Sequence, residues 1–131
     1  MATWKAGELA AIAAASELEI TSRRSDGTLR KPVTIWVVRV GEELYVRSVR
    51  GSEGSWYRGS RQRNQGRVEA GGVERDVDFM AAGHGLDEEI NVAYREKYDY
   101  PSSAVDHITS PEARETTIRL VPRSEAITPG S

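Results

Sequence analysis

The side chains with the clearest chemical potential are cationic and hydroxyl groups on either side of one β-rich segment. Arg30 and Lys31 precede this segment, and Ser48, Arg50 and Ser52 follow its second half. Arginine forks, hydroxyls and the free amides of a helix start are the groups that bind phosphate in proteins. We therefore expect an anion site here, and a phosphate-bearing cofactor is the leading hypothesis for its ligand.

Two β-rich runs joined by a tight turn must position these groups. The first run begins at Val33, the turn lies at residues 41–43, and the second run begins at Leu44. The first run is apolar on both faces, which predicts one strand covered on both sides. In an antiparallel hairpin the entry of the first strand meets the exit of the second, so Arg30 and Arg50 are expected to converge.

Two more cations belong to these groups, Arg24 before the first run and Arg47 at the exit of the second. Trp36 or Trp56 could supply a flat surface for a ring system. The alternative is that Trp56 packs a short helix on the sheet and that the arginines are solvated. The sequence leaves both interpretations open.

The remaining pattern predicts a small α+β fold. We expect helices at residues 6–15 and 52–66 and from Asp87 to the stop at Tyr100-Pro101, a further helical turn at 103–108, and strands at 17–21, 33–40, 44–50, 67–70, 73–81 and 116–122. Ser52 is expected to cap the second helix, and Asp87 to begin the clearest one. Hairpins early in the chain and a helix before the last strand favour a six-stranded antiparallel barrel flanked by two or three helices. We expect one domain at residues 1–123 and a flexible tail at 124–131.

Composition excludes several classes of function. The 131 residues contain no cysteine, so disulfides and thiolate metal sites are excluded. No apolar run approaches the roughly 20 residues of a membrane span, and no signal peptide is evident, so a cytoplasmic protein is expected. The net charge of −2 argues against nucleic-acid binding. Residues 47–67 nonetheless contain six arginines and one acid, which suits a local anion site or complementary surfaces in a dimer.

Catalytic constellations are scarce. The two histidines, His84 and His107, are far apart and lack the spacing of metal ligands, so no metal site is expected. No serine lies in a nucleophile-elbow context. Glu88 and Glu89 are better explained as charges at a helix N-terminus than as an acid–base pair.

Several motifs nevertheless resemble a known superfamily. They are Arg24-x-Asp26-Gly27-x-x-Arg30-Lys31-Pro32-Val33, Trp36-Val-Val, Gly41, Tyr45-Val-Arg-Ser48, Gly51 and Trp56-Tyr57. They resemble the FMN-binding split-barrel superfamily, which includes pyridoxamine-phosphate-oxidase-like proteins and deazaflavin-dependent nitroreductases. The stretches at 93–98, 100–103 and 116–123 resemble more closely a bacterial family known only as a domain of unknown function, number 2255.

The resemblance implies a six-stranded split β-barrel, a homodimer, and FMN or a deazaflavin near the dimer interface. Matching positions make Arg30, Lys31, Ser48, Arg50 and Trp56 the cofactor-binding candidates. The chain departs from the nitroreductase pattern after the second hairpin strand, where residues 49–52 replace a lysine and paired glycines. Cofactor identity, and cofactor binding itself, therefore stay open.

Two kinds of function follow as hypotheses. The first is an oxidoreductase in which a flavin or deazaflavin exchanges hydride with a small organic substrate, and the cofactor carries the chemistry. The second is a cofactor-free protein that uses the same barrel cavity to bind or convert a small molecule. In a cofactor-free enzyme, His84, Tyr94 or an acid would transfer the proton.

Overall fold

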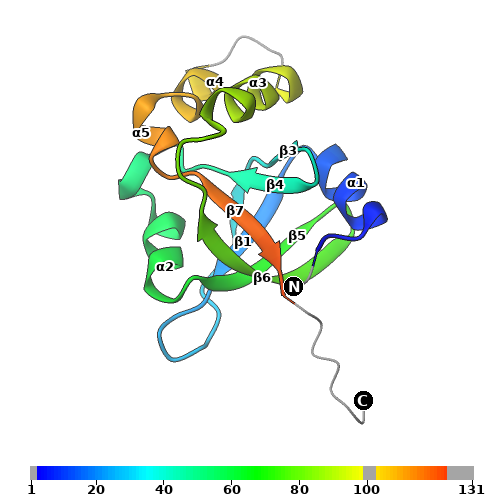
Figure 1. Cartoon of the computed structure of the whole chain (residues 1–131). Helices are drawn as coiled ribbons and strands as arrows, with labels where there is room; N and C mark the ends of the chain where they lie inside the picture. Colours follow the sequence, from blue (N-terminus) through cyan, green and yellow to red (C-terminus); the bar gives the residue numbers. More distant parts are fainter. Residues whose placement is uncertain (1–2, 99–102, 124–131) are drawn as a thin grey trace.

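One antiparallel sheet forms the centre of the computed structural model, which describes residues 3–98 and 103–123. Its strands in the described residues are β1 (Leu18–Ser22), β2 (Val33–Ile35), β3 (Val38–Val40), β4 (Glu43–Val46), β5 (Gln65–Ala70), β6 (Val73–Ala81) and β7 (Ile118–Pro122). Their order is β2-β1-β5-β6-β7-β4-β3. β2 and β3 lie at opposite ends of this order although only two residues join them, so the sheet curls back on itself as a split barrel (Figure 1). The predicted fold class is confirmed, with seven strands in place of six.

The additional strand arises because the predicted run at 33–40 is broken. Val33 pairs with Ile20 of β1, whereas Val38 pairs with Tyr45 of β4. Between them, the Val37 amide donates to the Tyr98 hydroxyl, and the Val37 carbonyl oxygen accepts from Lys97 Nζ. These bonds replace those that a neighbouring strand would make. The prediction of one continuous strand was therefore wrong, and so was the convergence that depended on it, because β2 leaves β4 at this corner.

Five α-helices and one 3-10 turn surround the sheet within the described residues. They are α1 (Ala6–Ala14), η1 (Gly51–Glu53), α2 (Ser55–Arg63), α3 (Asp87–Lys97), α4 (Ser103–Ile108) and α5 (Pro111–Arg114). Figure 1 shows α3, α4 and α5 together at one end of the barrel, with α1 and α2 on other sides. None of the helices in this part of the chain is long and apolar enough to cross a membrane.

Local signals account for most helix boundaries. The predicted helix start at Asp87 and the predicted helix at 103–108 are confirmed. The prediction that Ser52 caps α2 was wrong, because Ser52 lies in η1 and Gly54 is the N-cap residue. The helix α5 was not predicted. It begins after Ser110, whose hydroxyl accepts a hydrogen bond from the Ala113 amide.

The β5–β6 hairpin is the part of the sheet that local sequence specifies best. Ala70 pairs with Val73 across Gly71 and Gly72, which have φ values of +57° and +82°. Only glycine adopts such angles readily, so this pair fixes both the turn and the register. The predicted hairpin is confirmed.

Two hydrophobic cores lie on the two faces of the curled sheet. The inner core fills the barrel beneath α1 and includes Leu9, Leu44 and Trp56. The outer core lies between the β3–β4 hairpin and the helices α3 and α4, and it includes Tyr45 and Tyr94. Leu44 and Tyr45 are adjacent in β4 and face opposite cores, as strand geometry requires.

Residues 124–131, predicted to be a flexible tail, lie outside the described residues. The single domain expected at 1–123 stays a prediction.

Candidate functional site

The six residues that the sequence nominates fall into two groups around α2. Ser48, Arg50 and Ser52 lie in the connection from β4 through η1, and Trp56 begins α2 itself. Arg30 and Lys31 lie in the connection from β1 to β2. Arg30 reaches the second half of α2, where its Nη2 donates a hydrogen bond to Gln62. The two groups therefore meet through α2, and not directly at the end of a hairpin.

Ser48 is a buried residue that shapes the connection before α2. Its amide donates a hydrogen bond to Thr116 Oγ1 at 2.9 Å, and its carbonyl oxygen accepts one from the Gly51 amide at 3.0 Å. A Cβ atom at Gly54 would lie only 2.2 Å from Ser48 Oγ. The close approach of these residues thus requires glycine at the start of α2.

Arg30 carries a buried donor without an acceptor. Its Nε has no hydrogen-bond partner among the described residues. A Cβ atom at Gly59 would lie 3.0 Å from this Nε and 2.6 Å from Ser22 Oγ, so glycine gives the arginine room against α2. Because buried donors in proteins are nearly always bonded, an orphaned guanidinium nitrogen fits an anionic acceptor.

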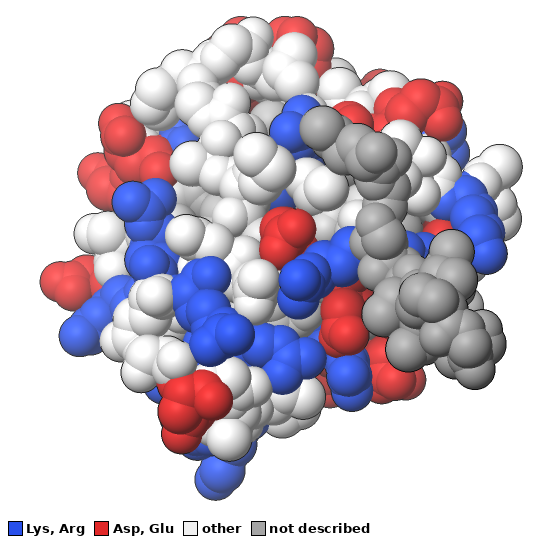
Figure 2. Space-filling model, turned by 60° about the horizontal axis from the view of Figure 1, so that its bottom comes forward, with Lys and Arg blue, Asp and Glu red and all other residues white. Residues whose placement is uncertain are grey.

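The surroundings of Arg30 are rich in cations that lack carboxylate partners. In residues 3–98 and 103–123, ion pairs engage none of Arg24, Arg30, Lys31, Arg50, Arg58, Arg61 and Arg63. Figure 2 shows basic side chains gathered on the face that carries the bottom of Figure 1, with acidic side chains among them. This donor set fits the phosphate of a nucleotide-like cofactor.

The two tryptophans proposed as ring surfaces lie in different environments. Trp56 is 7% exposed and packs in the inner core, so its ring is not an open surface. Trp36 is half-buried and stacks on Tyr98 with ring centroids 3.9 Å apart. Of the two, only Trp36 presents a partly open ring.

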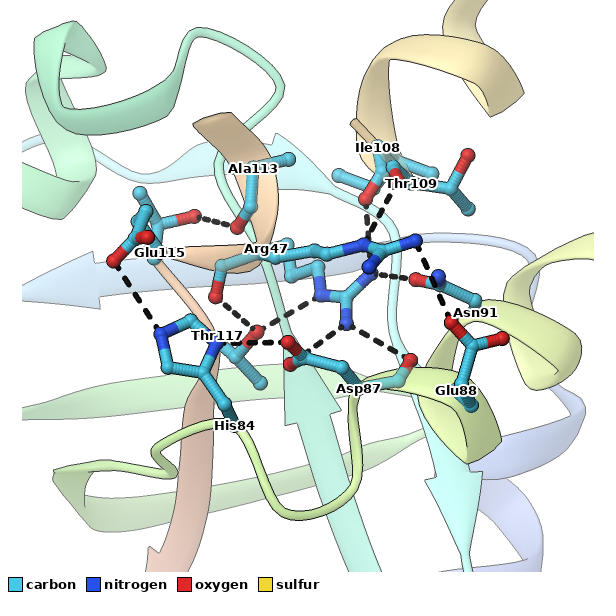
Figure 3. Close-up of polar contacts among 12 residues, drawn as sticks. Arg47, His84, Asp87, Glu88, Asn91, Ile108, Thr109, Ala113, Glu115 and Thr117 are labelled. Atoms are coloured by element: carbon cyan, nitrogen blue, oxygen red, sulfur yellow. Dashed lines mark hydrogen bonds and ion pairs between the residues drawn. The ribbon is translucent and has the colours of Figure 1, made fainter. Parts of the chain in front are cut away.

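A buried network around Arg47 is the most organised polar feature of the described residues (Figure 3). Arg47 is 1% exposed. Its Nε donates to Thr117 Oγ1 at 2.9 Å, its Nη1 to Asn91 Oδ1 and the Ile108 carbonyl oxygen, and its Nη2 lies 3.6 Å from Asp87 Oδ1. Burial lowers the pKa of Arg47, while the neighbouring Tyr94 and Asp87 oppose the shift.

The sequence analysis missed this network. It placed Arg47 among the cations of the anion site, but all three guanidinium nitrogens have protein partners. The alternation within β4 offered one signal, because Arg47 shares the outer face with Tyr45 and must follow it beneath α3. Tyr94, considered as a proton-transfer group, lies in α3 with its side chain fully buried in the outer core, and burial raises the pKa of its phenol. That candidate role is corrected, since the Tyr94 hydroxyl does not reach the surface.

His84 lies at the exposed edge of the Arg47 network. Its Nδ1 is 2.7 Å from Asp87 Oδ2 and its Nε2 is 3.4 Å from Glu115 Oε2. The hydrogen bond to Asp87, with the charges of Asp87 and Glu115, raises the pKa of His84. Figure 3 shows His84 between these two acids, on the loop that leads into α3. The His84–Asp87 pair can therefore hold a proton at the surface and release it as the pH rises.

This raised pKa predicts a stability contribution that depends on pH. Because the folded state favours imidazolium, the contribution is full below the ordinary histidine pKa of about 6.5 and is lost as pH rises through the higher folded value. His84→Gln should therefore lower the urea midpoint more at pH 6 than at pH 9. His107→Gln is the matched control, since His107 has no ion pair among the described residues. An equal loss at both pH values would contradict the prediction.

The comparisons with solved structures identify the fold. A structure described as F420 reductase is 12% identical, covers 92% of this chain and 97% of its own, and has a TM-score of 0.60. A Listeria innocua protein assigned as a pyridoxamine 5'-phosphate oxidase is 17% identical, with 88% and 90% coverage and a TM-score of 0.61. A FAD-binding protein from Mesorhizobium loti is 13% identical, with 94% and 93% coverage and a TM-score of 0.51. At these identities the likeness shows the split-barrel fold alone.

At the level of sequence, no curated protein matches this chain. One family does, described as "Uncharacterized protein conserved in bacteria (DUF2255)", and the match covers residues 8–120. It includes nearly the whole curled sheet and every helix except the first residues of α1. The predicted resemblance is confirmed, because the chain belongs to the DUF2255 family and has a split-barrel fold.

Proposed function

We propose that this chain binds a flavin or deazaflavin through its phosphate and acts as an oxidoreductase on a small organic substrate. Such a cofactor, when bound, supplies hydride transfer. The observation that carries the proposal is the cationic set around α2, which has no carboxylate partners in the described residues and contains the orphaned Nε of Arg30. Arg30, Lys31 and Arg50 are the residues that would hold the phosphate.

Each of these residues has a distinct part in binding. Arg30 is held against α2 by Gln62, so little conformational freedom is lost when it meets an anion. Lys31 and Arg50 are exposed and would neutralise charge. Ser48 shapes the connection before α2, Ser52 is exposed in η1, and the buried Trp56 anchors the helix in the inner core.

Structural neighbours support the same class of ligand. Two of them are described as F420 reductase and as a FAD-binding protein. The proposal includes a homodimer, as the split-barrel resemblance implies. Sedimentation velocity would test the dimer independently of cofactor binding.

Titration with FMN and with the deazaflavin F420, followed by ring fluorescence, tests the proposal. We expect one of them to bind, and Arg50→Ala to weaken its affinity about ten- to a hundredfold, because a hydrogen bond to a charged group contributes about 1.5–3 kcal/mol. Arg39→Ala is the matched control, since Arg39 is exposed, pairs with Glu42 and lies in the β3–β4 hairpin. Unchanged affinity in Arg50→Ala would show that Arg50 does not hold the phosphate.

One observation favours a second candidate, a cofactor-free small-molecule-binding protein. A Cβ atom at Gly51 would lie 3.3 Å from Glu112 Cβ, so α5 covers one side of the connection that a phosphate would approach. If neither FMN nor F420 binds, the oxidoreductase proposal fails and this second candidate becomes the better one.

A further inference from the structure

A cavity lies away from α2, at the break between β2 and β3. Its volume is about 510 Å³. Three segments meet there, namely the end of α1 with the link to β1, the corner between β2 and β3, and the end of α3. The described residues that line it are Ala14, Ser16, Glu17, Trp36, Lys97 and Tyr98.

The cavity contains a rigid aromatic surface. The Trp36 and Tyr98 rings are nearly parallel, with an interplanar angle of 8° and centroids 3.9 Å apart. The Tyr98 hydroxyl donates a hydrogen bond to the Ser16 carbonyl oxygen at 2.8 Å and accepts one from the Val37 amide at 3.3 Å. Two hydrogen bonds therefore hold the Tyr98 hydroxyl in place, and the buried Tyr98 ring supports the half-buried Trp36 ring as a preformed flat surface for a planar ring.

Lys97 places a cation beside this surface. Its Nζ donates a hydrogen bond to the Val37 carbonyl oxygen at 2.6 Å and lies 5.4 Å from the centroid of the Tyr98 ring. No carboxylate in residues 3–98 and 103–123 forms an ion pair with it. Burial without a counter-charge lowers the pKa of Lys97 to about 8.

This arrangement lacks one component, an anionic acceptor. An ammonium group has three donors, and the Val37 carbonyl oxygen uses one of them. Glu17 is the carboxylate among the described lining residues, and no ion pair joins it to Lys97. The carboxylate of a ligand would supply the missing charge, while the aromatic ring of the same ligand lay against Trp36.

We propose that this cavity binds a planar aromatic carboxylate, with its ring against Trp36, which is stacked on Tyr98, and its carboxylate on the ammonium group of Lys97. The site is separate from the phosphate-binding residues around α2. Its occupation requires neither a flavin nor the oxidoreductase activity proposed above, so each proposal can fail without the other.

Calorimetric titration with 4-nitrobenzoate tests the site, and 4-nitrobenzamide is the neutral control ligand. We expect the carboxylate to bind at least tenfold more tightly than the amide at pH 7. That affinity should fall about tenfold by pH 9, because an amine with a pKa near 8 goes from mostly protonated at pH 7 to mostly neutral at pH 9. The carboxylate itself does not titrate in this range.

Two substitutions at Lys97 separate charge from shape. Lys97→Arg should keep the preference for the carboxylate and lose its pH dependence, since arginine stays protonated. Lys97→Met should lose the preference for the carboxylate and its pH dependence, while retaining weak binding of either ligand. Trp36→Leu should weaken the binding of both ligands. Circular dichroism checks that each variant is folded.

Four results would overturn the proposal. They are absence of binding by the wild-type chain, equal binding of the carboxylate and the amide by that chain, an unchanged preference in Lys97→Met, and unchanged affinity in folded Trp36→Leu.

Discussion

Replacing Arg47 with alanine is expected to lower the free energy of unfolding by about 3–5 kcal/mol. Arg47 is 1% exposed, and its guanidinium bonds to Thr117, Asn91 and two backbone carbonyl oxygens and pairs with Asp87. Alanine would leave these groups without their donor in a region that water does not reach. It would also leave a cavity where the arginine stem packs.

Urea unfolding at pH 7 measures this effect. Arg39→Ala is the matched control, because Arg39 lies in the neighbouring strand and its ion pair with Glu42 is exposed. We expect a loss of no more than about 1 kcal/mol in that control. Arg47→Lys should fall between the two, since lysine keeps the charge but cannot satisfy the same set of acceptors. If Arg47→Ala is as stable as the control, the network does not stabilise the fold.

Gly66→Ala is the second substitution with a large expected effect, a loss of about 1–3 kcal/mol. Gly66 lies in β5, between β1 and β6. An added Cβ would lie 2.1 Å from the Thr21 carbonyl oxygen and 2.6 Å from Cζ of the Phe79 ring. The first neighbour is backbone of a paired strand, so relief requires β1 and β5 to separate locally.

Gly7→Ala provides the comparison for Gly66→Ala. Gly7 lies in α1, and a Cβ there would meet no atom within 4 Å. Alanine has a higher helix propensity than glycine. The free energy of unfolding of this variant should therefore equal that of the wild type or exceed it by up to about 1 kcal/mol. Thermal unfolding of both variants tests the pair. A Gly66→Ala variant as stable as Gly7→Ala would be incompatible with the close approach of β1 and β5.

The sequence by itself determined the elements that depend on neighbouring residues. The β5–β6 hairpin follows from Gly71 and Gly72, because their positive φ angles fix a tight turn. The helix from Asp87 follows from acids in its first turn and a helical apolar spacing. The motifs across the chain also predicted the split-barrel fold and the DUF2255 family, both of which are confirmed.

The sequence predicted which residues belong to the candidate site around α2, but it did not predict their positions relative to one another. Arg30 and Lys31 were expected to meet Arg50 at one end of a hairpin. Because β2 pairs with β1 and not with β4, Arg30 instead lies against α2, where it bonds to Gln62. The pairing partner of each strand depends on residues distant in the chain, so the run at 33–40 alone could not reveal the break.

Only the tertiary structure decided which charged side chains are buried. Arg47 is covered by α3, by the end of α4 and by Thr117 just before β7, and its partners there lie 40 to 70 positions away in the sequence. Lys97 likewise acquires its lowered pKa from burial against the corner at Val37. Periodicity within one segment gives the face on which a side chain lies, but only packing by distant segments removes that face from water.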